Sequence, residues 1–274
     1  MHASTVRTLL VRGMIAGVLA GLFAFALAYL AGEPSVRDSI ALEETQSAPA
    51  AAHAPGATHE HGEEEEEELV TRPVQSTFGL ATGVLVYGVA LGGIASLVFS
   101  VCLGRIGGFG PRATAALIAG AAFTTVYLVP FLKYPATPPA VGNPDTIGKR
   151  TTLFFLMIVL SVLLAVVAVI AGRRLAPKLG NWNASVVAGA GYVVAVAVAC
   201  LVLPGNSDAV RETFPAALLW EFRLASVAVQ ALLWTAFGLI FGALAERVLR
   251  PGGQGVSAAG VDAGGVTSPV RTAG

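Results

Sequence analysis

Six long apolar stretches dominate this sequence and restrict its fold more than any other feature. Each contains about 20 consecutive, mostly apolar residues, the length that a helix needs to cross the hydrocarbon core of a bilayer. Ala, Leu and Val follow one another without the alternation that the strands of a membrane β-barrel require. The sequence therefore predicts an all-α integral membrane protein, a bundle of about six transmembrane helices. The stretches are Leu9–Ala31, Phe78–Leu103, Ala113–Leu132, Thr152–Ala171, Ala184–Leu203 and Phe222–Ala245.

The placement of the basic residues predicts the orientation of this bundle. Two very short loops between the stretches are basic: one holds Arg105 and Arg112, and the other holds Arg173, Arg174 and Lys178. Since Lys and Arg accumulate in short cytoplasmic loops, we expect these loops and both the N- and C-termini to be cytoplasmic. The predicted location is the bacterial inner membrane, which the chain crosses several times.

The chain divides into four predicted segments. Residues 1–32 form the first transmembrane helix, which we expect to remain as an uncleaved signal anchor. Residues 33–77 form an extracytoplasmic loop that begins directly after Gly32. Residues 78–246 form a five-helix transmembrane bundle, with a Pro-rich outer loop over residues 133–151 that we expect to be stiff and non-helical. Residues 247–274 are rich in Gly, Ala and Ser, and we expect them to be a disordered cytoplasmic tail.

Small residues recur at four-residue spacing in three of the apolar stretches. Because one small residue per helical turn lets two backbones approach closely, such patterns mark helix–helix contacts in membranes. We expect packing seams inside one bundle, and contacts between copies of the chain are the alternative. The three patterns are Gly13, Gly17 and Gly21, then Gly88, Gly92 and Ser96, and finally Gly238 with Gly242.

The extracytoplasmic loop carries the strongest chemical signal in the sequence, a short histidine-rich segment that runs into six consecutive glutamates. Imidazole and carboxylate groups this close together favour binding of a divalent transition metal such as Co²⁺, Ni²⁺ or Zn²⁺, although ligand type alone does not name the metal. A solvated run of charge is the alternative interpretation. The predicted metal ligands are His53, His59, Glu60, His61, Glu63, Glu64 and Glu65.

Ionisable residues near the membrane gather at the outer ends of the predicted spans. A charge at the bilayer centre costs about 2.5 to 3.5 kcal/mol, and none of the six spans clearly contains one. A path through the bundle would therefore rely on uncharged polar groups such as Thr82, Tyr87, Thr124, Thr125, Tyr127, Gln230 and Thr235, for which packing is the alternative role. The charged candidates for an outer vestibule, or else for interfacial anchoring, are Glu33, Lys133, Asp145, Glu221 and Arg223.

The sequence lacks the motifs that would indicate catalysis or nucleotide binding. Residues 142–151 approach the P-loop pattern, but they have one residue too many before Gly148 and an arginine where the P-loop has Ser or Thr. Neither a zinc-protease motif nor a nucleophile elbow occurs. We therefore predict a non-enzyme with no permanently bound cofactor and with neither nucleotide nor nucleic acid as a partner.

Several longer motifs are similar to those of a known family. The chain resembles the CbtA family of bacterial cobalt transporter subunits over nearly all of residues 7–246. The motifs that carry the resemblance are Gly32-Glu33-Pro34, the His/Glu segment with residues 68–72, residues 75–80, residues 129–136, residues 138–142, residues 145–148, residues 214–216, residues 218–220 and residues 222–226.

This resemblance implies cobalt uptake linked to cobalamin synthesis, beside a small one-helix, histidine-bearing partner called CbtB. Taken with the residues themselves, it gives a hypothesis of a membrane subunit that imports a divalent transition metal, with the His/Glu segment as an external capture site. The alternative is a non-transporting scaffold that holds a metal-delivery partner through its small-residue seams.

Overall fold

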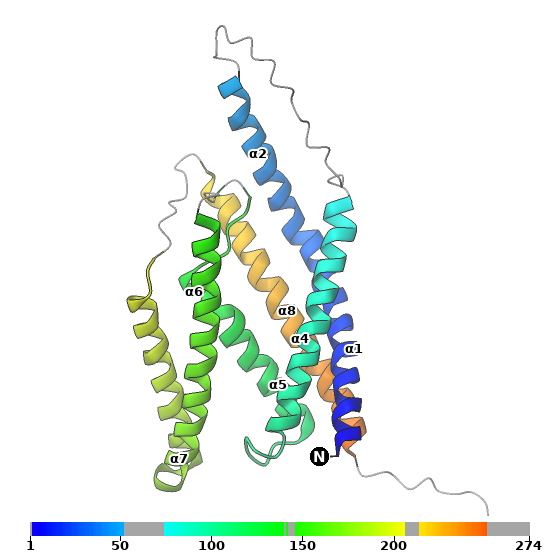
Figure 1. The fold of residues 1–274 in the computed structure, drawn as a ribbon, viewed down its shortest axis with the longest axis vertical. Coiled ribbons are helices and arrows are strands. Elements are labelled where there is room, and N and C mark those ends of the chain that lie inside the picture. Colours follow the sequence, from blue (N-terminus) through cyan, green and yellow to red (C-terminus); the bar gives the residue numbers. More distant parts are fainter. Residues whose placement is uncertain (1, 52–73, 140, 142–145, 206–213, 251–274) are drawn as a thin grey trace, which may run out of the picture.

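Helices are the only regular secondary structure in the part of the chain that the computed structural model describes, which is residues 2–51, 74–139, 141, 146–205 and 214–250 (Figure 1). Five helical segments are long and apolar enough to cross a membrane. The predicted all-helical membrane class is thus confirmed. The five segments are Ala3–Thr45, Gln75–Cys102, Pro111–Lys133, Ile147–Val202 and Ala216–Leu249.

The first helix is much longer than the sequence indicated. Helix α1 (Ala3–Leu27) passes through a π-helical turn, η1 (Ala28–Gly32), directly into α2 (Glu33–Ala51). The expectation that a loop begins after Gly32 is therefore wrong for residues 33–51. Pro34 does not break the helix because the wider turn precedes it, with the Glu33 N–H donating to the Ala28 carbonyl.

Two further spans also contain a π-helical turn. The turn η2 (Gln75–Gly79) leads into α4 (Leu80–Cys102), and η3 (Phe123–Leu128) joins α5 (Pro111–Ala122) to α6 (Val129–Lys133). A π-helical turn inserts an extra residue and redirects the side chains that follow it. These spans coincide with the second and third predicted stretches.

Helix α7 (Ile147–Val202) contains both the fourth and the fifth predicted stretches. Gly180 adopts φ 77° and ψ 158°, which is not helical, and there the chain turns back on itself (Figure 1). The two arms lie side by side, since the hydroxyls of Ser161 and Tyr192 are hydrogen-bonded at 2.8 Å. The first arm begins at Ile147, so the expectation of a non-helical loop as far as residue 151 is wrong for its last five residues.

The tightest contact in the bundle is between α1 and α4. A Cβ atom added to Gly13 would lie 2.6 Å from the Gly92 carbonyl oxygen and 2.5 Å from the Ser96 Cβ, and one added to Gly17 would collide with the Gly88 carbonyl. The predicted seams therefore lie within one bundle. The same holds for α8 (Ala216–Leu249), where a Cβ on Gly238 would lie 2.9 Å from the Ala119 Cβ of α5.

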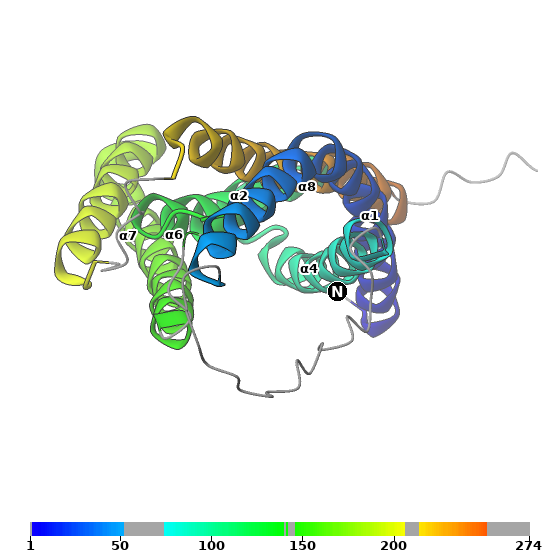
Figure 2. The ribbon, with the colours of Figure 1, turned by 90° about the horizontal axis from the view of Figure 1, so that it is seen from above.

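Helices α1, α4, α5 and α8 enclose the main core, and the α7 hairpin stands at the side of this group (Figure 2). At the end of the bundle away from α2, the buried Phe99 and Phe241 rings meet edge to face with centroids 5.1 Å apart. Nearby, Arg112 pairs with Glu246 at 2.7 Å, and Arg12 donates to the Leu244 carbonyl at 2.8 Å. These contacts close that end of the helix group.

Replacing Gly17 with leucine should separate α1 from α4. We expect the free energy of unfolding in detergent to fall by more than the ~1–3 kcal/mol typical of overpacking, because the side chain would meet backbone that cannot yield. Thermal unfolding of the purified protein measures this effect. The matched control is Gly83→Leu in α4, where nothing lies within 4 Å of an added Cβ. Equal destabilisation by both substitutions would contradict the packing argument.

Candidate functional site

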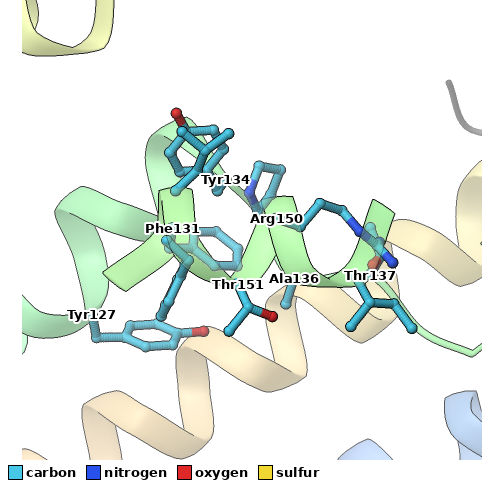
Figure 3. Close-up of a pocket in the computed structure, with 11 residues that line it drawn as sticks. Tyr127, Phe131, Tyr134, Ala136, Thr137, Arg150 and Thr151 are labelled. Atoms are coloured by element: carbon cyan, nitrogen blue, oxygen red, sulfur yellow. The ribbon is translucent and has the colours of Figure 1, made fainter. Parts of the chain in front are cut away.

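Two adjoining cavities lie at the end of the bundle where α2 emerges. The first, of about 290 Å³, is bounded by α6, the Pro-rich segment that follows it and the start of α7 (Figure 3). The second, of about 320 Å³, lies among η1, η3, α2 and α8. Tyr127 and Ala136 line both cavities. We call the two together the outer vestibule.

Two π-helical turns of the described chain line the second cavity, and a third ends beside it. Ala28 and Gly32 of η1 and Tyr127 of η3 line it, and so does Leu80, the first residue after η2. Turns of this kind weaken the regular hydrogen-bond ladder and occur frequently at functional sites. Their convergence on one cavity therefore distinguishes this end of the bundle from the tightly packed opposite end.

Tyr127 brings an unpaired hydroxyl to the point where the two cavities meet. Its ring is held between Phe123 and Phe131, with centroids 6.0 Å and 5.5 Å away, since residues four apart share a helix face. The hydroxyl oxygen is buried and has no hydrogen-bond partner within the described part of the chain. Figure 3 shows this hydroxyl pointing away from the Tyr127 backbone towards the interior of the site.

Gln230 supplies a second unpaired oxygen from α8. Its side chain interacts with the Tyr87 hydroxyl of α4, whereas its Oε1 atom is buried and has no partner among the described residues. Ser226, one turn earlier on the same face of α8, also lines the cavity. Buried polar groups are usually hydrogen-bonded, so two unpaired oxygens beside one cavity favour a site for water or a ligand.

Glu33 is the only carboxylate among the described residues that line the vestibule. Its side chain is 6% exposed, and Oε1 lies 3.7 Å from Nε of Arg37, one helical turn further along α2. The continuous helix places this carboxylate beside the cavity, whereas a loop beginning at Gly32 would not fix its position. The carboxylate gives the second cavity a negative group, and Arg150 gives the first cavity a positive one.

The Pro-rich segment is fastened to its surroundings by two hydrogen bonds. The Tyr134 hydroxyl donates to the Pro204 carbonyl at 2.8 Å, and Arg223 Nε donates to the Ala136 carbonyl at 3.3 Å. Burial raises the pKa of Tyr134 above its ordinary value, so the phenol stays protonated and can donate at neutral pH. The segment thus has a fixed position beside the first cavity.

The structure separates the charged residues that were predicted to share a vestibule. Glu33 lines the second cavity, and Arg223 holds the Pro-rich segment without lining either cavity. Lys133 lies over the Tyr134 ring, 5.8 Å from its centroid, and the Glu221 side chain is exposed on α8. Neither of these two residues lines the vestibule. Outside the described residues are Asp145 and the predicted metal ligands His53, His59, Glu60, His61, Glu63, Glu64 and Glu65.

Sequence reasoning named some of the polar lining residues and missed others. Tyr127 and Gln230 were among the uncharged candidates, whereas Thr82 and Thr235 are exposed. Arg150 of the first cavity was not singled out. The basic pair Lys149-Arg150 just before an apolar stretch offered a weak signal for it, since such residues often lie at a membrane boundary.

The donor set of the second cavity consists of oxygen atoms: one carboxylate, two hydroxyls and an amide oxygen. Among the residues that the structure describes, no group of three or more His, Cys, Asp and Glu side chains is placed to hold a metal ion. One carboxylate with neutral oxygens suits a cation that keeps its water shell, since the waters can donate to those oxygens. The arrangement therefore suits a hydrated cation chemically.

Helices of this length and hydropathy define a multi-pass membrane protein, with a vestibule at one end that contains a carboxylate and unpaired oxygen atoms. Residues 6–246 match the model of the family described as "Probable cobalt transporter subunit (CbtA)", so the chain belongs to the CbtA family. No curated protein and no solved structure shows a significant match to it.

Replacing Tyr134 with phenylalanine should loosen the Pro-rich segment. Loss of one part-buried hydrogen bond costs about 1 kcal/mol, and we expect faster exchange of the backbone amide hydrogens of Ala136 and Thr137. Residues 135, 138 and 139 are prolines and have no amide hydrogen to exchange. The difference from the unaltered protein should be constant below pH ~10, the ordinary tyrosine pKa, and vanish as the pH rises through the raised value. Tyr29→Phe, which alters an exposed tyrosine, is the control. Unchanged exchange in Y134F would show that the hydrogen bond does not hold the segment.

Proposed function

We propose that this protein is the membrane-embedded subunit of an importer for a divalent transition metal, and that this metal is cobalt. The observation that carries the proposal is the second cavity, where Glu33 lies beside the unpaired oxygens of Tyr127 and Gln230. Helix packing alone does not require these polar groups to lie beside the same cavity. Binding and passage of a cation would require them there.

The positive-inside rule supports an external position for this vestibule. We count the α7 hairpin as two crossings, which makes six in all, and we propose that both termini are cytoplasmic. Arg105 lies in the turn between α4 and α5, and Arg173 lies in α7 shortly before its bend at Gly180, both at the end opposite α2, where the rule expects them. The vestibule then faces the same side as the His/Glu segment, which follows α2 in the chain.

The His/Glu segment and the vestibule have different tasks in this proposal. Imidazoles prefer cobalt, nickel and zinc over calcium and magnesium, so the histidines from His53 to His61 would enrich a transition metal near the membrane. The oxygens of the vestibule would then receive the ion with its waters, and Glu33 would favour a positive charge there. In this proposal the His/Glu segment selects the metal ion, and the helix bundle provides the route by which the ion crosses the membrane.

The closed inner end indicates that passage needs a further step. The Phe99–Phe241 contact and the Arg112–Glu246 pair block the helix group at the far end from the vestibule. Since the sequence has no nucleotide-binding motif, the proposed movement that opens this end is driven by an ion gradient or by a partner subunit. A small one-helix CbtB-like protein is the partner we propose.

The same closed end also supports the second candidate function, an accessory subunit that captures metal but does not conduct it. Vesicles that contain only this chain separate the two candidates. Cobalt entry into such vesicles would rule out the accessory role. Entry that occurs only after a CbtB-like partner is added, and that the vestibule substitutions abolish, would support a joint conducting site. Entry with the partner that is indifferent to the vestibule would support the accessory role.

Substituting Glu33 tests the vestibule directly. We expect Glu33→Gln to lower the rate of cobalt uptake at limiting metal roughly tenfold, because a charged contact of about 1.5 kcal/mol is lost. Uptake of radioactive cobalt by cells that depend on this protein measures the effect. The matched control is Glu221→Gln, which removes an equal charge from the exposed surface of α8. Equal losses in the two variants would refute a specific role for the cavity.

Substituting the loop histidines tests the capture step. We expect His59→Ala combined with His61→Ala to reduce uptake at limiting cobalt and to leave it near normal at high cobalt. The defect should disappear below pH ~6, where unperturbed histidines are protonated and do not bind metal even in the unaltered protein. His2→Ala is the control, because this histidine lies at the other end of α1. Unchanged uptake at limiting metal would refute the capture role.

A further inference from the structure

A third cavity, of about 790 Å³, lies at the end of the molecule opposite the outer vestibule. It is lined by the turn between α4 and α5, residues 104–109, and by both arms of the α7 hairpin between Ala165 and Tyr192. Figure 1 shows that turn and the bend of the hairpin at the same end of the molecule. The proposed metal path does not use it. We call it the inner cavity.

The inner cavity has a basic rim and an apolar interior. Arg105 lines the cavity from the turn between α4 and α5, and Arg173 and Asn181 line it from α7 on either side of the bend at Gly180; we call this polar part of the lining the rim. The wall rises from Arg173 to Ala165 along the first arm, a distance of about 12 Å at 1.5 Å per residue. Small and apolar residues form most of this wall, with Ser185 and Tyr192 as the polar members on the second arm. The small and apolar members include Ala168, Val169, Gly172, Ala188 and Gly189.

No carboxylate of the described residues neutralises the positive charge at the rim. No acidic residue lines the cavity, and within the described part of the chain neither Arg105 nor Arg173 has a carboxylate within ion-pair distance. Arg105 donates Nη1 to the Val101 carbonyl at 2.6 Å, which fixes its direction and leaves its other donors available. The rim can therefore bind an anionic group with two guanidinium groups.

The apolar wall persists because the hairpin is packed against the bundle mainly at its other end. Val129 and Tyr134 of the α6 region meet Met157 and Ala199 near the hairpin ends. Between the arms, Gly172 approaches Ala188, where an added Cβ would lie 3.2 Å from the Ala188 Cβ. This close contact draws the two arms together and leaves the cavity beside them open.

We propose that the inner cavity binds a phospholipid with an anionic headgroup from the cytoplasmic leaflet. Its headgroup phosphate lies between Arg105 and Arg173, and its acyl chains run along the wall from Gly172 towards Ala165. Basic pockets between transmembrane helices on the cytoplasmic side are typical sites for such lipids. A partner helix would fit the small-residue wall, but it would not satisfy two uncompensated arginines at the membrane surface. The two arginine charges therefore favour an anionic lipid over a partner helix as the occupant.

The full-length protein in bilayer discs of phosphatidylethanolamine and phosphatidylglycerol in equal amounts allows a direct test. Native mass spectrometry after extraction measures which lipid is retained. We expect Arg105→Gln with Arg173→Gln to reduce retained phosphatidylglycerol about tenfold, since two charge-assisted contacts are lost. The matched control, Arg174→Gln with Arg247→Gln, removes the same charge from nearby residues outside the cavity, and we expect less than a twofold change. Equal losses would show general surface attraction and overturn the proposal.

A second pair of variants tests the cavity without changing its charge. Ala168→Trp should fill the wall and expel the lipid, whereas Val167→Trp, on an exposed neighbouring position that does not line the cavity, should leave it bound. Retention in both variants would overturn the proposal. So would displacement of the lipid by inorganic phosphate alone, because the acyl chains would then contribute nothing. A photoreactive group at residue 168 should label lipid in native membranes, and labelling of a small membrane protein instead would assign the cavity to a partner helix.

Discussion

The close approach of α1 and α4 through glycine is the contact on which the rest of the bundle depends. Inside a bilayer, apolar side chains gain little by leaving lipid for another helix, so association relies on van der Waals contact and hydrogen bonds. Gly13 and Gly17 bring the α1 backbone against Gly92 and Gly88. This seam fixes the path of α1, and the uninterrupted helix beyond it sets the position of Glu33 in the vestibule.

The apolar spans and their seams could be predicted because both are local patterns. A continuous run of apolar residues needs no knowledge of its neighbours, and neither does a glycine every fourth residue. The end of the first helix could not be predicted in the same way. Gly32 and Pro34 usually interrupt a helix, but the π-helical turn that ends at Gly32 accommodates the proline, and that turn depends on the surrounding structure.

The polar residues of the vestibule were recognisable one by one, but their convergence was not. Tyr127 and Gln230 lie 103 positions apart in the chain and meet only because α8 crosses η3. Glu221 and Glu33 look equivalent in sequence, since each stands beside a predicted span. Their side chains differ because a helix has two faces, and only the packed structure says which face of α8 is exposed.

The α7 hairpin is attached near one end and free along most of its length, which gives it the mechanics of a lever. Its contacts with α6 and η3 lie near Met157, and the bend at Gly180 is about 35 Å away at 1.5 Å per residue. Each degree of rotation about the attachment therefore moves the bend by roughly 0.6 Å. A small rotation of the hairpin beside Tyr134 therefore produces a larger displacement of its bend at the opposite membrane surface. A molecule bound next to the bend would act at the point where this displacement is greatest.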